Sequence, residues 1–108
     1  MAAAAQVVAQ AAAVVAVVDG EGRRLEVRRP SALERLRVLK AVGPVGAMND
    51  RYLGVAMLAA CVVSVDGVPL PFPGNEAAVE ASVARLGDAG LEAAAGVLGA
   101  EEENEPGN

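Results

Sequence analysis

Apolar and charged residues alternate on the far side of a glycine-containing turn near the start of the chain. Residues 13–18 are rich in Val, residues 19–22 read Asp-Gly-Glu-Gly, and Leu25 and Val27 are then separated by charged neighbours. Val suits a pleated strand, and glycine supplies the positive φ that a tight turn requires. The pattern predicts a β-hairpin over residues 13–29, with Leu25 and Val27 on the face toward the core.

Helical spacing replaces this alternation after Pro30. Ser31 and Glu34 form a capping-box pattern, because each side chain can accept the other residue's backbone N–H. The Gly43-Pro44 pair ends the helix, which we predict over about residues 31–42. Its apolar positions recur every three residues, with Val38 beside them: Leu33, Leu36, Leu39 and Val42.

Three further helices follow by the same reasoning. Asn49 or Asp50 can cap a helix over about residues 50–64 that is apolar on nearly all sides, so it is either the central helix of the domain or exposes one side to a partner. The remaining two helices, separated by Gly87, are predicted at 75–86 and 88–98.

A proline-rich stretch lies between the helices predicted at 50–64 and 75–86. Residues 65–69 predict a turn, and residues 69–73 predict an extended segment, because each Pro lacks an N–H donor and moves its predecessor out of the helical region. For the same reason this segment cannot be a central strand.

Together these elements predict one small domain over residues 13–99. Its fold class is mainly α, with the N-terminal β-hairpin packed on a small bundle of three to four helices. Residues 1–12 are mostly Ala and predict a flexible arm, whereas the acidic residues 100–108 predict a disordered tail.

The amino-acid composition excludes most of the side-chain combinations that enzymes use for catalysis. The chain has 108 residues, of which 52 are Ala, Val or Leu; it has no His and one Cys, Cys61, which reads as a small core residue. Without an imidazole or a second thiol, a Ser-His nucleophile, a Cys/His metal site and an intramolecular disulfide cannot be assembled. No glycine cluster has the spacing of a phosphate loop. We therefore expect no enzyme, no catalytic or metal-binding residues and no cofactor.

The charge distribution is uneven although the net charge is only -5. Seven of the nine basic residues lie within 23–40, whereas residues 76–108 hold eight acids and Arg85. The low pI of about 4.6 and the scarcity of aromatic residues argue against nucleic-acid binding. The basic residues are better interpreted as the solvated faces of a strand and a helix.

Neither apolar stretch of the chain has the features of a targeting or membrane segment. Residues 1–18 lack a basic n-region and contain Gln6 and Gln10, and the run from Leu53 to Val65 is shorter than the ~20 residues that span a bilayer. The sequence thus predicts a cytoplasmic protein that is neither secreted nor inserted in a membrane.

The order of these features resembles a family of tail assembly chaperones of tailed bacteriophages and prophages. The resemblance covers about residues 14–98 and is carried by five pieces: the hairpin end and cap at 22–32, the helix at 33–42, the helix start at 49–52, the Val-Asp-Gly-Val-Pro phrase at 65–69, and the Arg-Leu-Gly-Asp-Ala-Gly-Leu-Glu phrase at 85–92.

The resemblance implies a small helical protein of the host cytoplasm. It would bind the tape measure protein, help to recruit major tail protein subunits to the growing tube, and stay out of the virion. The family offers no catalytic residues to carry over. From the residues themselves we place the partner-binding surface on Tyr52, Leu53 and Met57 of the predicted central helix, and the sequence specifies no oligomeric state.

The sequence is also compatible with two other functions. One is a structural virion component, such as a head-tail connector or a minor tail protein, which would stay in purified particles. The other is a small nucleic-acid-binding regulator that uses the basic residues between Arg23 and Lys40, and its affinity would fall steeply with salt.

Overall fold

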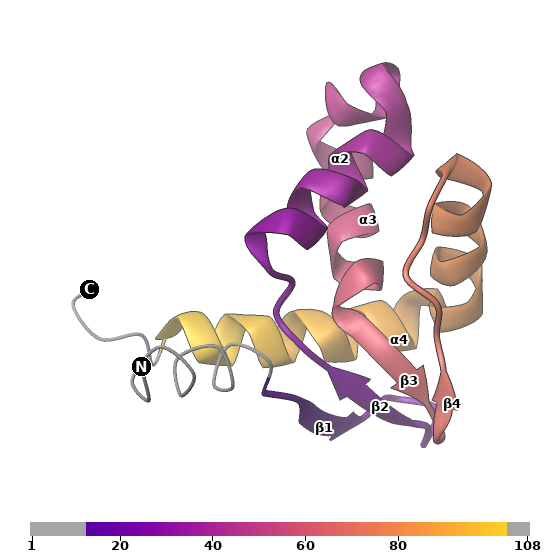
Figure 1. Ribbon diagram of the computed structural model, residues 1–108. Coiled ribbons are helices and arrows are strands. Elements are labelled where there is room, and N and C mark those ends of the chain that lie inside the picture. Colours follow the sequence, from indigo (N-terminus) through magenta and orange to yellow (C-terminus); the bar gives the residue numbers. More distant parts are fainter. Residues whose placement is uncertain (1–12, 104–108) are drawn as a thin grey trace, which may run out of the picture.

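A computed structural model describes residues 13–103 of the chain (Figure 1). The elements in chain order are β1 (Val15–Val18), β2 (Arg24–Val27), α2 (Ala32–Ala47), α3 (Asp50–Cys61), β3 (Val62–Val65), β4 (Val68–Pro69) and α4 (Glu76–Glu103). The strands form one antiparallel sheet in the order β1-β2-β3-β4. The fold is therefore mixed α/β, and the predicted mainly α class, with a lone hairpin on helices, is corrected to a four-stranded sheet with helices.

The predicted hairpin is present as β1 and β2. Val17 pairs with Leu25 and Val15 pairs with Val27, and both β2 residues are buried as expected. In the turn, Gly22 has a φ of 79° and donates its N–H to the carbonyl of Asp19 at 3.0 Å. The sequence pattern thus gave the correct face and the correct turn of this hairpin.

The helix predicted over residues 50–64 ends earlier than expected. It stops at Cys61, and Val62–Val65 form β3, which pairs with β2 through Val27 and Val62 and through Leu25 and Val65. The β-branched Val residues suit a strand, and pairing with β2 satisfies the backbone while burying Val62 and Val65. This long-range pairing outweighs the local helical pattern.

A second hairpin, which the sequence pattern did not reveal, joins β3 to β4. Asp66 and Gly67 both have positive φ, 49° and 80°, as a type I′ turn requires. β4 has two residues and forms the edge of the sheet, where the missing N–H of Pro69 is tolerated.

The capping box at the start of α2 is confirmed. The Ser31 hydroxyl accepts the Glu34 N–H at 3.1 Å, and Glu34 Oε1 accepts the Ser31 N–H at 2.9 Å. Arg28 also donates to both Glu34 carboxylate oxygens, at 2.8 and 2.7 Å, so the start of α2 is tied to the end of β2. Gly43, with a φ of 78°, breaks the helix where the sequence predicted its end, and a short helical turn continues to Ala47.

The two predicted C-terminal helices form one helical run, α4, that bends at Gly87 (φ 64°). The run continues to Glu103, so residues 100–103, predicted as part of a disordered tail, are helical. The rest of that tail, 104–108, and the predicted arm, 1–12, lie outside the described residues.

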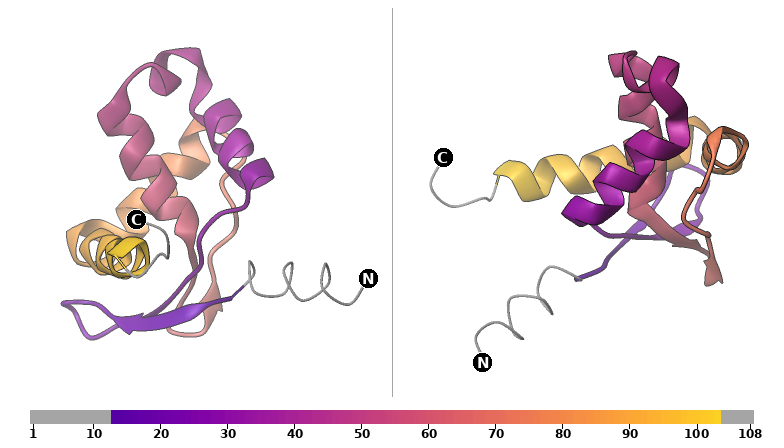
Figure 2. Two further views of the ribbon diagram at one scale, coloured as in Figure 1. Left: turned by 90° about the vertical axis from the view of Figure 1, so that its left-hand side faces the viewer. Right: turned by 45° about the horizontal axis from the view of Figure 1, so that its top comes forward.

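Two apolar clusters follow from this arrangement. Figures 1 and 2 show α2 and α3 side by side above the sheet, with the second half of α4 along one face of the sheet. The first cluster joins the sheet, the end of α3 and α4: Leu25, Val27, Ala59, Cys61, Val62, Val65, Leu86 and Ala94. The second joins α2, α3 and the first half of α4: Val38, Ala41, Val42, Ala56, Ala60 and Val79.

The bend in α4 is held by the turn of the first hairpin. Arg23 donates to the carbonyls of Arg85 and Leu86 at 3.0 and 2.6 Å, at the point where the first half of α4 loses its own hydrogen-bond partners. The buried carboxylate of Asp19 accepts the Arg23 Nε–H at 2.8 Å. Burial opposes the ionisation of Asp19, but backbone N–H groups of Arg23 and Glu21 and the guanidinium outweigh it and lower the pKa of Asp19.

Candidate interaction surface

An apolar concave surface lies between α3 and the first half of α4. Both helices begin at the end of the molecule far from the sheet (Figure 1). Each is capped by an Asn: the Asn49 amide oxygen accepts the Tyr52 N–H at 3.0 Å, and the Asn75 amide oxygen accepts the Ala78 N–H at 2.8 Å. These caps fix where the two helices start and therefore which side chains meet between them.

The α3–α4 groove has a volume of about 530 Å³. Its floor is made of buried Ala56 and Val79 together with half-buried Val83, and Val55 forms an exposed wall. Its lining residues are Asn49, Arg51, Tyr52, Val55, Ala56, Val79, Glu80, Val83 and Ala84. Small and branched apolar side chains below a few polar groups are typical of a site that receives apolar side chains.

Tyr52 and Glu80 connect the two helices across this groove. The Tyr52 hydroxyl donates to Glu80 Oε2 at 2.9 Å, and this hydrogen bond to the carboxylate raises the pKa of Tyr52. The pair separates the α3–α4 groove from a second hollow of about 410 Å³ that reaches Val42 and Val45 of α2. Two adjoining hollows on either side of Tyr52 form one surface.

The three residues predicted to bind a partner do not share one surface. Tyr52 lines both hollows. Leu53 and Met57 are half-buried and pack against the second apolar cluster. Met57 also lines a third hollow of about 340 Å³ that Leu98 of α4 borders. The proposed binding role of these residues stays a prediction, with Tyr52 as its best-placed member.

Sequence reasoning missed the residues that complete the groove. Val79 and Val83 are four residues apart and therefore adjacent on one helix face, and Val55 lies three residues after Tyr52. This spacing is visible in the sequence, but the adjacency of α3 and α4 is not. Val45 and Met48, at the corner between α2 and α3, are also strongly exposed at 83% and 87%.

The face of α2 that looked most apolar in the sequence is exposed. Of the positions recurring every three residues, only Val42 is buried, together with neighbouring Val38, whereas Leu33, Leu36 and Leu39 are 53%, 61% and 37% exposed. Residues three apart drift around a helix by about 60° per step, since each residue turns about 100°. The series therefore leaves the side that contacts α3, and the leucines form a ridge on the outside.

Within residues 13–100 no three or more His, Cys, Asp or Glu side chains are grouped so that they could hold a metal ion. Among the helices between residues 13 and 103, none is both long and apolar enough to cross a membrane. Comparison of the chain with known protein families, with curated proteins and with solved structures found no match.

Proposed function

We propose that the chain is a tail assembly chaperone of a bacteriophage or prophage, which binds the tape measure protein in the host cytoplasm and assists assembly of the tail tube. The order of sequence features over residues 14–98 supports the class of protein. The observation that carries the proposal is the apolar α3–α4 groove, because a protein that shields another chain needs a surface for apolar side chains.

The groove suits one face of an amphipathic helix. Such a helix presents apolar side chains three and four residues apart, and two of them can occupy the hollows on either side of Tyr52. Arg51 and Glu80 at the rim supply one charge of each sign, which orients a partner without excluding it by net charge. A tape measure protein, as a long and partly apolar helical chain, fits this description.

The test uses co-expression with the tape measure protein of the same phage genome, followed by co-purification and a binding titration. Val55→Asp places a charge on the exposed wall of the groove, and Val68→Asp is the matched control on β4, where Val68 is 60% exposed. We expect Val55→Asp to weaken binding by about tenfold or more, because a charge facing an apolar partner loses its hydration. Val68→Asp should bind like the wild type.

Two results would contradict the proposal. The first is failure of the wild-type chain to co-purify with the tape measure protein. The second is binding of Val55→Asp that is as tight as binding of Val68→Asp, with both variants folded normally by circular dichroism. Mass spectrometry of purified particles provides a further arm, since a chaperone is absent from the virion. Stoichiometric amounts of the chain in particles would favour a structural virion component instead.

A further inference from the structure

The exposed leucine ridge of α2 lies outside the α3–α4 groove and has no role in the proposed function. At about 60° per step, Leu39, Leu36 and Leu33 lie about 60°, 120° and 180° around α2 from buried Val42, and all three are exposed. Large apolar side chains gathered on one exposed helix face are typical of an interaction site, whereas single exposed leucines are ordinary. The ridge is therefore a candidate interaction site, and the charges beside it indicate what kind of partner would cover it.

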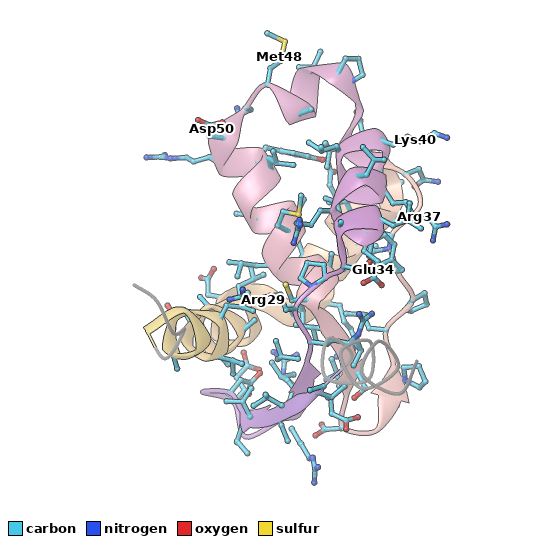
Figure 3. The ribbon with its side chains drawn as sticks, turned by 60° about the vertical axis from the view of Figure 1, so that its left-hand side comes forward. Arg29, Glu34, Arg37, Lys40, Met48 and Asp50 are labelled. Atoms are coloured by element: carbon cyan, nitrogen blue, oxygen red, sulfur yellow. The ribbon has the colours of Figure 1, made fainter. Side chains whose placement is uncertain are left out.

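The ridge is bordered by positive charge. Helical spacing places Arg37 next to Leu33 and Lys40 next to Leu36, each four residues later in the chain. Arg35 instead borders the third hollow, beside Met57 of α3. Figure 3 shows Arg37 and Lys40 pointing away from the body of the molecule. Within residues 13–100, neither Arg37 nor Lys40 has a carboxylate partner.

The one acidic residue of α2, Glu34, lies on the same side of the helix as Arg37 (Figure 3). Its charge is already paired, because Arg28 and the backbone N–H of Ser31 bind its carboxylate. The α2 outer face, defined here as Leu33, Leu36, Leu39, Arg37 and Lys40, thus combines exposed leucines with two cations that have no carboxylate partner within residues 13–100.

We propose that the α2 outer face docks an acidic amphipathic helix of another protein. The partner's apolar side chains would cover the leucines, and its Asp or Glu side chains would face Arg37 and Lys40. Charge complementarity selects this occupant. A second copy paired through the same face would bring like charges together, and a nucleic acid would meet leucines where a single strand needs aromatic stacking partners.

The regular part of α2 limits the length of the contact. From Ala32 to the break at Gly43 it has three turns, or about 16 Å, which matches three turns of a partner helix. So short a seam gives modest affinity and fast exchange, which suits a transient complex. This inference does not rest on the proposed function, because it uses different residues and a different partner surface.

The test measures binding of two synthetic helical peptides to the full chain by fluorescence anisotropy. One peptide has Leu at helical spacing with Glu on both flanks, and the other has Lys in place of every Glu. We expect the acidic peptide to bind in the micromolar range, about tenfold or more tighter than the basic one, and to weaken as salt rises. Equal binding of the two peptides, tighter binding of the basic one, or no binding of either at millimolar concentration would overturn the proposal.

Two variants locate the site. Arg37→Glu combined with Lys40→Glu should reverse the preference between the peptides, and Leu36→Gln should weaken both. The control combines Arg24→Glu and Arg85→Glu, which change the net charge equally from exposed positions on β2 and α4 outside the groove. If the control variant loses affinity for the acidic peptide as strongly as the α2 variant, the peptide responds to overall charge, and the proposal is wrong.

Two further measurements decide between the other occupants. A short DNA duplex is one alternative occupant. The face would be assigned to nucleic acid if the duplex bound with an affinity equal to or higher than that of the acidic peptide and if Arg37→Glu with Lys40→Glu abolished this binding. Sedimentation of the free chain as a dimer that Leu36→Gln dissociates would assign it to a second copy. Either result overturns the proposal, and a monomeric chain without DNA affinity is the expected outcome.

Discussion

Replacing Glu34 by Gln removes one charge at the junction of β2 and α2 while leaving the helix cap in place. The Glu34 carboxylate accepts hydrogen bonds from Arg28 at 2.8 and 2.7 Å, and its Oε1 also accepts the Ser31 N–H at 2.9 Å. The amide oxygen of Gln can still accept the Ser31 N–H, as in other capping boxes. The substitution therefore isolates the ion pair with Arg28.

The size of the effect follows from the pKa of Glu34. The side-chain hydrogen bonds from Arg28, followed by the backbone N–H of Ser31, lower this pKa from 4.5 to about 2. A difference of that size corresponds to about 3 kcal/mol of unfolding free energy. The Arg28 and Glu34 side chains are 25% and 21% exposed, so solvent screening reduces the value, and we expect about 1–2 kcal/mol at pH 7.

The pH dependence gives the prediction its sign. Because the pKa of Glu34 is lowered in the folded state, its contribution is fully present above the unfolded value of 4.5 and is lost as the pH falls toward about 2. Urea denaturation followed by circular dichroism should show Glu34→Gln less stable than the wild type at pH 7, with the difference nearly gone near pH 2. The control is Glu92→Gln at an exposed position of α4, which should be neutral at both pH values. The reasoning is refuted if Glu34→Gln is as stable as the wild type at pH 7, or if the difference is unchanged near pH 2.

Two further predictions concern the bend in α4 and use the same denaturation assay. Arg23→Met removes the donors to the Arg85 and Leu86 carbonyls. We therefore expect about 2–3 kcal/mol of destabilisation. A loss of stability below ~0.5 kcal/mol would show that solvent replaces these hydrogen bonds. Gly87→Ala should cost about 1–2 kcal/mol, because a Cβ is strained at a φ of 64° although space is open there. The matched control is Gly96→Ala, which is also in open space on α4. This variant should be more stable by up to about 1 kcal/mol, because Ala has a higher helix propensity than Gly. Equal effects of the two variants on stability would contradict a role for the positive φ of Gly87 in the bend.

Features set by neighbouring residues could be predicted from the sequence. The Ser31 capping box, the Asp-Gly-Glu-Gly turn and the helix breaks at Gly43 and Gly87 all depend on residues a few positions apart, and each is found where it was expected. Their hydrogen bonds form within one turn of chain, so the residue types alone specify them.

Features that depend on distant residues could not be predicted in this way. Val62–Val65 continues the apolar run of α3, and it becomes a strand only because β2 lies beside it. The α3–α4 groove likewise depends on two helices that are distant in sequence, so Tyr52 could be named from its own helix, but Val79 and Val83 could not. In both cases the missing information is tertiary contact rather than local preference.

The distribution of leucine and alanine gives the interaction proposals their physical basis. Five of the buried residues in the two clusters are Ala, whereas Leu25 and Leu86 are the two leucines buried completely, and Leu33, Leu36 and Leu39 are left in solvent. Burying a Leu stabilises a fold by about 1.5–3 kcal/mol, which is more than an Ala can give, so a chain selected only for its own stability would place these residues the other way round. Small side chains between α2, α3 and α4 let the helices approach closely, and the large ones are then available for contact with another protein. A leucine ridge beside Arg37 and Lys40 is therefore unfavourable for the isolated domain and useful in a complex, which is why the α2 outer face and the α3–α4 groove are best tested with partners present.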